Sequence, residues 1–112
     1  MKMEVTRRLR IAELNDRLRQ SFTGGRVMKT ASIAALPIDV QATIMGRVRS
    51  FTAFTTGNDP HGEHDFGSFE VAGYRVFWKI DYYDEHMQNG SENPTDPTKT
   101  TRVLTIMLAE DY

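Results

Sequence analysis

The segment His61–Asp65, HGEHD, holds the densest group of side chains able to do chemistry. Two residues separate His61 from His64, and each imidazole can bind a metal ion through a ring nitrogen. With Asp65 they offer the nitrogen and oxygen ligands that Zn²⁺, Mn²⁺ or Fe²⁺ accept. A divalent-metal site at His61, His64 and Asp65 is therefore one hypothesis. The alternative is a turn whose polar side chains cap its own backbone groups.

Other polar residues near this segment extend the set of binding candidates. The full set is His61, Glu63, His64, Asp65, Asp81, Tyr83 and Asp84. The chain has no cysteine, no Gly-x-Ser-x-Gly motif and no phosphate-binding glycine loop. Because these signatures of nucleophilic catalysis are missing from the sequence, a protein that is not an enzyme is favoured, although the enzyme question stays open.

A hairpin follows the histidine segment and must position it. Phe66–Val71 and Tyr74–Tyr82 are rich in aromatic and β-branched residues, and Ala72-Gly73 between them predicts a two-residue turn. Counting outward from this turn pairs Glu70 with Arg75, Gly67 with Trp78, and His64 with Asp81. The last pair predicts a histidine that a carboxylate orients.

The two faces of this hairpin follow from the same register, because side chains alternate along a strand. The predicted core face carries Phe69, Val71, Tyr74, Val76, Trp78, Ile80 and Tyr82. Gly67 should leave room for the ring of Trp78. A base-stacking platform of Tyr74, Trp78, Tyr82 and Tyr83 is the alternative, but it would require Trp78 to face solvent.

Two helices precede the hairpin. Val5–Phe22 is predicted to be amphipathic, with its apolar face at Ile11, Leu14, Leu18 and Phe22 and a polar surface that includes Asn15, Asp16 and most of the arginines. Pro37–Phe51 is the second predicted helix. Arg26–Thr30 is a short candidate strand, and Arg102–Ala109 reads as an interior strand because both its faces are apolar.

These elements predict one α+β domain spanning residues 1–112, with two N-terminal helices packed on a mostly antiparallel sheet of three to four strands. The polar segment Glu85–Thr101 lies between the last two strands. We expect this loop to be mobile or to become ordered only with a partner.

Charge is distributed unevenly along a chain whose net charge is −1. Residues 1–57 carry a net charge of +6 and residues 58–112 a net charge of −7. Packing of one half on the other is the simplest interpretation. The alternatives are nucleic acid bound by the arginine-rich first helix and a protein partner that meets the acidic half. No apolar run spans a bilayer, so we expect no membrane association and a cytoplasmic location.

Five segments of the chain together resemble a small alphaproteobacterial domain family of unknown function. They are RIAELNDRLRQSF, GGRVMKT, NDPHGEHDFGSFE, FWKIDYYD and GSENPTDPTKTTRVLTIMLAEDY, and they cover the chain from about Arg10 to Tyr112. The resemblance implies a short protein often found on plasmids and other mobile elements. No activity comes with the family, so it assigns no catalytic residue.

The order of elements is also similar to that of the RelE/ParE toxin group, in which two helices, a hairpin and a last strand follow one another. This chain departs from that group because it is not basic and because a strand at Val27–Met28 lies between its helices.

Two functional hypotheses follow from the sequence. The first is a non-enzymatic binding protein of bacterial mobile genetic elements that inhibits or modulates a host defence complex, with a protein partner and no cofactor. The alternative is a small, toxin-like, metal-dependent hydrolase or nuclease that uses the His61–Asp65 segment and a divalent ion.

Overall fold

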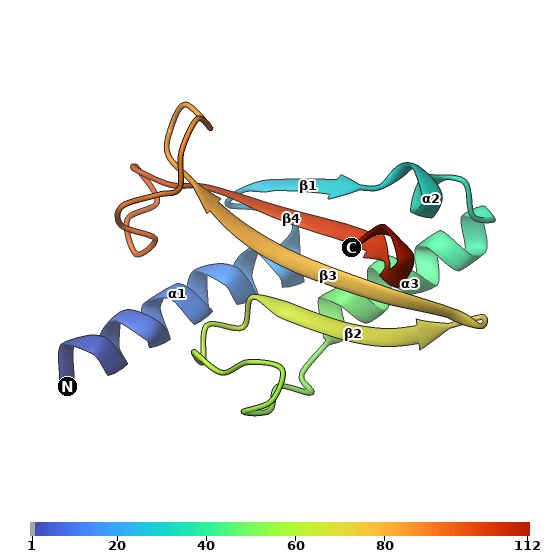
Figure 1. Cartoon of the computed structure of the whole chain (residues 1–112), viewed down its shortest axis with the longest axis horizontal. Helices are drawn as coiled ribbons and strands as arrows, with labels where there is room; N and C mark the ends of the chain where they lie inside the picture. The colour runs from blue at the N-terminus through green and yellow to red at the C-terminus, as the bar shows by residue number, and fades with distance from the viewer. Residues whose placement is uncertain (1) are drawn as a thin grey trace.

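The α-helices lie on one face of a four-stranded sheet (Figure 1). The structure is a computed structural model that describes residues 2–112. Its elements are α1 (Lys2–Ser21), β1 (Arg26–Lys29), α2 (Ala31–Ala34), α3 (Ile38–Ser50), β2 (Phe66–Val71), β3 (Tyr74–Tyr83), β4 (Thr101–Leu108) and the 3₁₀ helix η1 (Ala109–Asp111). The predicted α+β fold is thereby confirmed.

The sheet is mixed, with the strand order β1-β4-β3-β2. β2 pairs with β3 and β3 with β4 in the antiparallel sense, whereas β1 pairs with β4 in the parallel sense. β1 and β4 are far apart in the chain, so no hairpin turn restricts their relative direction. β4 is an interior strand, as its two apolar faces predicted.

The hydrophobic core lies between the helices and one sheet face. It includes Trp78 and Ile80 from β3, and Ile44 and Val48 from α3. Trp78 is fully buried, and a Cβ atom added to Gly67 would lie only 2.3 Å from its Nε1 atom. The predicted register from Phe66–Lys79 to Val71–Tyr74 is therefore confirmed, and so is the core face, except that Tyr74 beside the turn is exposed. The burial of Trp78 excludes the stacking platform that included it.

The turn of this hairpin places a side chain in a strained conformation. Ala72 and Gly73 have φ angles of 52° and 84°, which are the positive values of a type I′ turn. Alanine rarely adopts positive φ, whereas asparagine tolerates it. We expect Ala72→Asn to raise the free energy of unfolding by about 0.5–1 kcal/mol, as measured by urea unfolding. Gly73→Asn, at the neighbouring position, should not stabilise the protein.

The first helix differs from its prediction at both its ends and its faces. α1 begins at Lys2 and ends at Ser21, whereas Val5–Phe22 was expected. Asn15 and Arg19, which the sequence placed on the polar surface, are 0% and 1% exposed. Both follow Ile11 at four-residue steps and so lie on the face that packs on the sheet.

Within residues 2–112, no helix is both long and apolar enough to cross a membrane.

The loop between β3 and β4 has a defined backbone with its own hydrogen bonds. The amide of Ser91 donates to the carbonyl of Tyr82 at 3.0 Å, and the hydroxyl of Thr100 donates to the carbonyl of Asn93 at 2.8 Å. Arg102 donates to the carbonyl of Pro94 and holds the loop near the sheet. The loop is thus more structured than its composition indicated. The mobility of this loop in solution stays a prediction.

Candidate functional site

The polar residues around the predicted histidine site form a network that begins at Arg19. Its Nη1 atom donates to the carbonyls of Val48 at 3.0 Å and Phe51 at 2.7 Å, at the C-terminal end of α3. Its Nη2 atom donates to Asp16 at 2.9 Å. Because the last carbonyls of a helix lack partners within the helix and carry partial negative charge, this buried guanidinium both caps α3 and complements its dipole.

His64 joins this network through Asp16 and not through Asp81. Its Nδ1 atom lies 3.0 Å from both carboxylate oxygens of Asp16, and its ring stacks on Phe54 with the centroids 3.9 Å apart. The predicted His64–Asp81 pair is wrong. His64 has a φ of 55°, which turns the chain away from β3 just before the ladder begins. Asp81 instead accepts from Lys79 at 2.9 Å.

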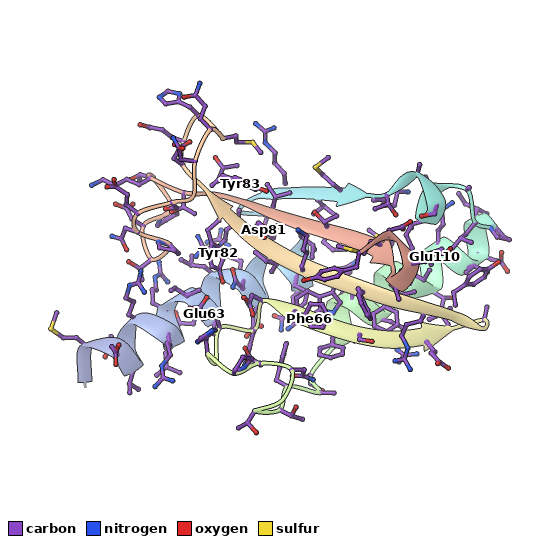
Figure 2. All side chains as sticks on the ribbon, viewed as in Figure 1. Glu63, Phe66, Asp81, Tyr82, Tyr83 and Glu110 are labelled. Carbon is purple, nitrogen blue, oxygen red and sulfur yellow. The ribbon has the colours of Figure 1, made fainter. Side chains whose placement is uncertain are left out.

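Glu63 and Tyr82 form a second network beside α1 (Figure 2). The Tyr82 hydroxyl donates to Glu63 Oε1 at 2.8 Å and accepts from Asn15 Nδ2 at 2.8 Å. Asn15 also accepts from Arg102 Nε at 2.9 Å. Burial raises the pKa of Tyr82 well above its usual range, and burial lowers the pKa of Arg102. Tyr82 is therefore a neutral donor at physiological pH, which keeps the Glu63 carboxylate in one orientation.

The three predicted metal ligands do not come together. His61 is exposed and lines a pocket beside α1, His64 turns toward Asp16, and burial raises the pKa of Asp65. In the described part of the chain, residues 2–112, no three His, Asp or Glu side chains are placed to hold a metal ion. A carboxylate from α1, Asp16, which the sequence did not place there, contacts Nδ1 of His64 and sets the orientation of its ring.

Asp81 and Tyr83 lie apart from Glu63, toward the C-terminal end of β3 (Figure 2), and Asp84 directly follows this strand. Asp84 accepts from the amide of Gln88 at 3.0 Å and of His86 at 3.1 Å, and these bonds lower its pKa. Tyr83 forms an antiparallel bridge to Gly90. Here Asp84 stabilises the start of the loop, as the short acidic side chains of turns commonly do.

Two hollows flank the N-terminal half of α1. The first is a groove of about 550 Å³ between α1 and the loop after β3, lined by Met3, Glu4, Thr6, Arg7, Arg10, Asn93 and Thr95. The second is a pocket of about 310 Å³ between α1 and the loop before β2, lined by Glu4, Arg7, Arg8, His61 and Glu63. Of the predicted candidates, His61 and Glu63 therefore lie at a common concave surface.

Sequence reasoning missed Asn15, Asp16, Arg19, Tyr82 and Arg102 as members of these networks. One signal was present for two of them, because Asn15 and Arg19 share the helical face of Ile11 and Leu18. A polar residue on an apolar helical stripe indicates a buried hydrogen-bonding group. The other three depend on which elements pack together.

The fold and its networks define a two-layer α+β domain in which buried polar side chains connect an N-terminal helix to the sheet. The chain belongs to the DUF3768 family, described as a protein of unknown function, which matches residues 29–111. The predicted membership of a family of unknown function is thereby confirmed. α1 lies outside the matched residues. No curated protein matches the chain, and no solved structure matches it.

Proposed function

We propose that this protein is a non-enzymatic binding protein that holds an acidic, amphipathic segment of a partner protein in the groove between α1 and the loop after β3. One observation carries the proposal. The N-terminal half of α1 extends beyond the sheet (Figure 1), and its Met3, Val5 and Leu9 side chains are 86%, 42% and 59% exposed. Met3 lines the groove itself, and Val5 and Leu9 leave further apolar surface exposed on the same projecting helix, a feature typical of interaction sites.

The charge of the groove favours an acidic partner. Arg7 and Arg10 line it together with Met3, so apolar and cationic surfaces adjoin. Glu4 is the one carboxylate among its lining residues, and Arg10 also contacts Glu13 at 3.3 Å. A helix or extended segment that presents apolar side chains flanked by carboxylates complements this surface, and such complementarity speeds association and selects the partner.

The biological role that we propose for this binding is inhibition or modulation of a host defence complex by a product of a bacterial mobile element. It is supported by the resemblance of the chain to proteins that are often found on plasmids and other mobile elements. The alternative, a metal-dependent hydrolase or nuclease, gains no support from the arrangement of the His61–Asp65 segment, since no three His, Asp or Glu side chains within residues 2–112 are placed to hold a metal ion.

Selection from a random peptide library displayed on phage tests the proposal. We expect enriched peptides to combine apolar residues with Asp or Glu, and their binding to weaken with added salt. Reversing two groove charges, in Arg7→Glu/Arg10→Glu, should reduce binding by about tenfold or more. Arg17→Glu/Arg26→Glu is the matched control, because it makes the same change in net charge at exposed arginines outside the groove.

Two results would contradict the proposal. One is enrichment of peptides without acidic residues. The other is equal loss of binding in the groove variant and in the control variant, which would mean that net charge alone attracts the peptides. Circular dichroism of each variant checks that the fold is unchanged.

A further inference from the structure

We infer that the pocket on the other flank of α1 binds a small phosphorylated ligand that also carries hydroxyl groups. This pocket has a volume of about 310 Å³ and is lined by Glu4, Arg7, Arg8, His61 and Glu63. It lies between α1 and the loop that leads into β2, apart from the loop after β3. The inference goes beyond the proposed protein-binding function, because it concerns a different class of ligand and a second pocket, which shares Glu4 and Arg7 with the groove.

The cationic side of the pocket is free to bind an anion. Arg7 and Arg8 are exposed, and neither forms a side-chain hydrogen bond or an ion pair with another residue in the range 2–112. The guanidinium group presents a planar fork of donors that matches the oxygens of a phosphate. The exposed imidazole of His61 adds a third donor on the opposite wall. These three side chains can hold one phosphoryl group.

The acceptor side of the pocket is built on a fixed carboxylate. The Glu63 amide donates to Asp59 at 3.1 Å, and its carbonyl accepts from Asn15 at 2.9 Å. Its side chain accepts from the Tyr82 hydroxyl at 2.8 Å. Contacts from α1, from β3 and from its own loop therefore hold Glu63 on three sides. A preorganised carboxylate of this kind accepts hydrogen bonds from ligand hydroxyls without losing further conformational freedom.

The combination of arginines and carboxylates in the lining determines which class of ligand can bind. Glu4 and Glu63 would repel a bare anion, and their charge also opposes a continuous nucleic-acid backbone. A neutral sugar would leave Arg7 and Arg8 without an anion. A ligand with one phosphoryl group and neighbouring hydroxyls can bind the arginines through its phosphoryl group and the carboxylates through its hydroxyls. The volume lies near the lower end of the roughly 300–1,000 Å³ of known ligand pockets, so the ligand is small.

NMR titration with three simple probes tests the inference on the full chain. Ribose 5-phosphate carries both kinds of group, inorganic phosphate carries only the anion, and ribose carries only the hydroxyls. We expect saturable binding of ribose 5-phosphate at millimolar concentration or below, with shifts at both the His61 ring and the Tyr82 ring. Inorganic phosphate should bind more weakly and shift the His61 ring alone, and ribose should not bind.

Variants separate this pocket from the groove on the other side of α1. Arg8 lines only the pocket and Arg10 only the groove. Arg8→Gln should weaken ribose 5-phosphate binding by about tenfold or more, as loss of a charge-assisted hydrogen bond does, whereas Arg10→Gln should leave it unchanged. Glu63→Gln should reduce the affinity for ribose 5-phosphate to that for inorganic phosphate, and its amide oxygen can still accept from Tyr82.

Three results would overturn the inference. They are the absence of saturable ribose 5-phosphate binding, equal weakening by Arg8→Gln and Arg10→Gln, and equal affinity for inorganic phosphate and ribose 5-phosphate. The last result would indicate an adventitious ion only. Because Arg8→Gln changes only the pocket and Arg10→Gln only the groove, either proposal can fail while the other stands.

Discussion

Replacing Trp78 with alanine is expected to lower the free energy of unfolding by about 3–5 kcal/mol, the usual loss for truncation of a large core residue. Trp78 is 0% exposed, and its ring meets the ring of Phe51 edge-on at 5.5 Å. The ring also fills the space that Gly67 leaves open. A cavity of this size cannot collapse easily, because the sheet forms one wall and the helices form the other. Urea unfolding followed by circular dichroism measures the loss.

Packing, and not hydrogen bonding, should account for this loss. The indole nitrogen of Trp78 has no hydrogen-bond partner in the described residues. Tyr74→Ala is the matched control, since Tyr74 lies on the same face of β3 but is 38% exposed beside the turn of the hairpin. We expect the control to lose about 1 kcal/mol or less. If Trp78→Ala lost no more than the control, the assignment of the two sheet faces would be incorrect.

Arg19→Ala is the second substitution with a large expected effect, a loss of about 3–5 kcal/mol in the free energy of unfolding. The change removes the donor that the carbonyls of Val48 and Phe51 share, and it leaves Asp16 with His64 as its remaining partner. Groups buried without partners carry a desolvation penalty. The C-terminal turn of α3 should then open locally more often. Amide hydrogen exchange at that turn should therefore become faster than in the parent protein.

Arg17→Ala provides the control, because Arg17 is an exposed arginine on the same helix. It should change the free energy of unfolding by about 0.5 kcal/mol or less. Arg19→Lys keeps the charge but lacks the planar fork, so it should recover only part of the loss. Equal losses in Arg17→Ala and Arg19→Ala would show that Arg19 acts only through helix propensity and that the cap on α3 contributes nothing.

The candidate site shows where prediction from sequence reached its limit. The pattern of the His61–Asp65 segment indicated that this loop holds polar residues able to bind a ligand, and the structure does place His61 and Glu63 at a pocket. The sequence pattern did not indicate that α1 would form the facing wall of this pocket. The contact between Asp16 and His64 joins residues 48 positions apart. No local pattern encodes such a pair, because it depends on how a helix and a loop pack.

The sequence by itself determined the hairpin, including its register and its buried face. Alternation along a strand and the two-residue turn are local properties, so counting from Ala72-Gly73 was sufficient to pair Gly67 with Trp78. Helical periodicity likewise located α1 and α3 to within a few residues. Local patterns of this kind depend only on backbone geometry and on which side chains avoid water.

The tertiary structure alone decided how these elements join. The pairing of β1 with β4, the burial of Arg19 and the partner of His64 all bring together segments that are distant in the chain. A polar side chain can be stable in water or in the interior, provided that its hydrogen bonds are satisfied. Whether Arg19 and Asn15 face solvent or the core therefore depends on whether another element supplies carbonyls and carboxylates there, and only the packed fold supplies them.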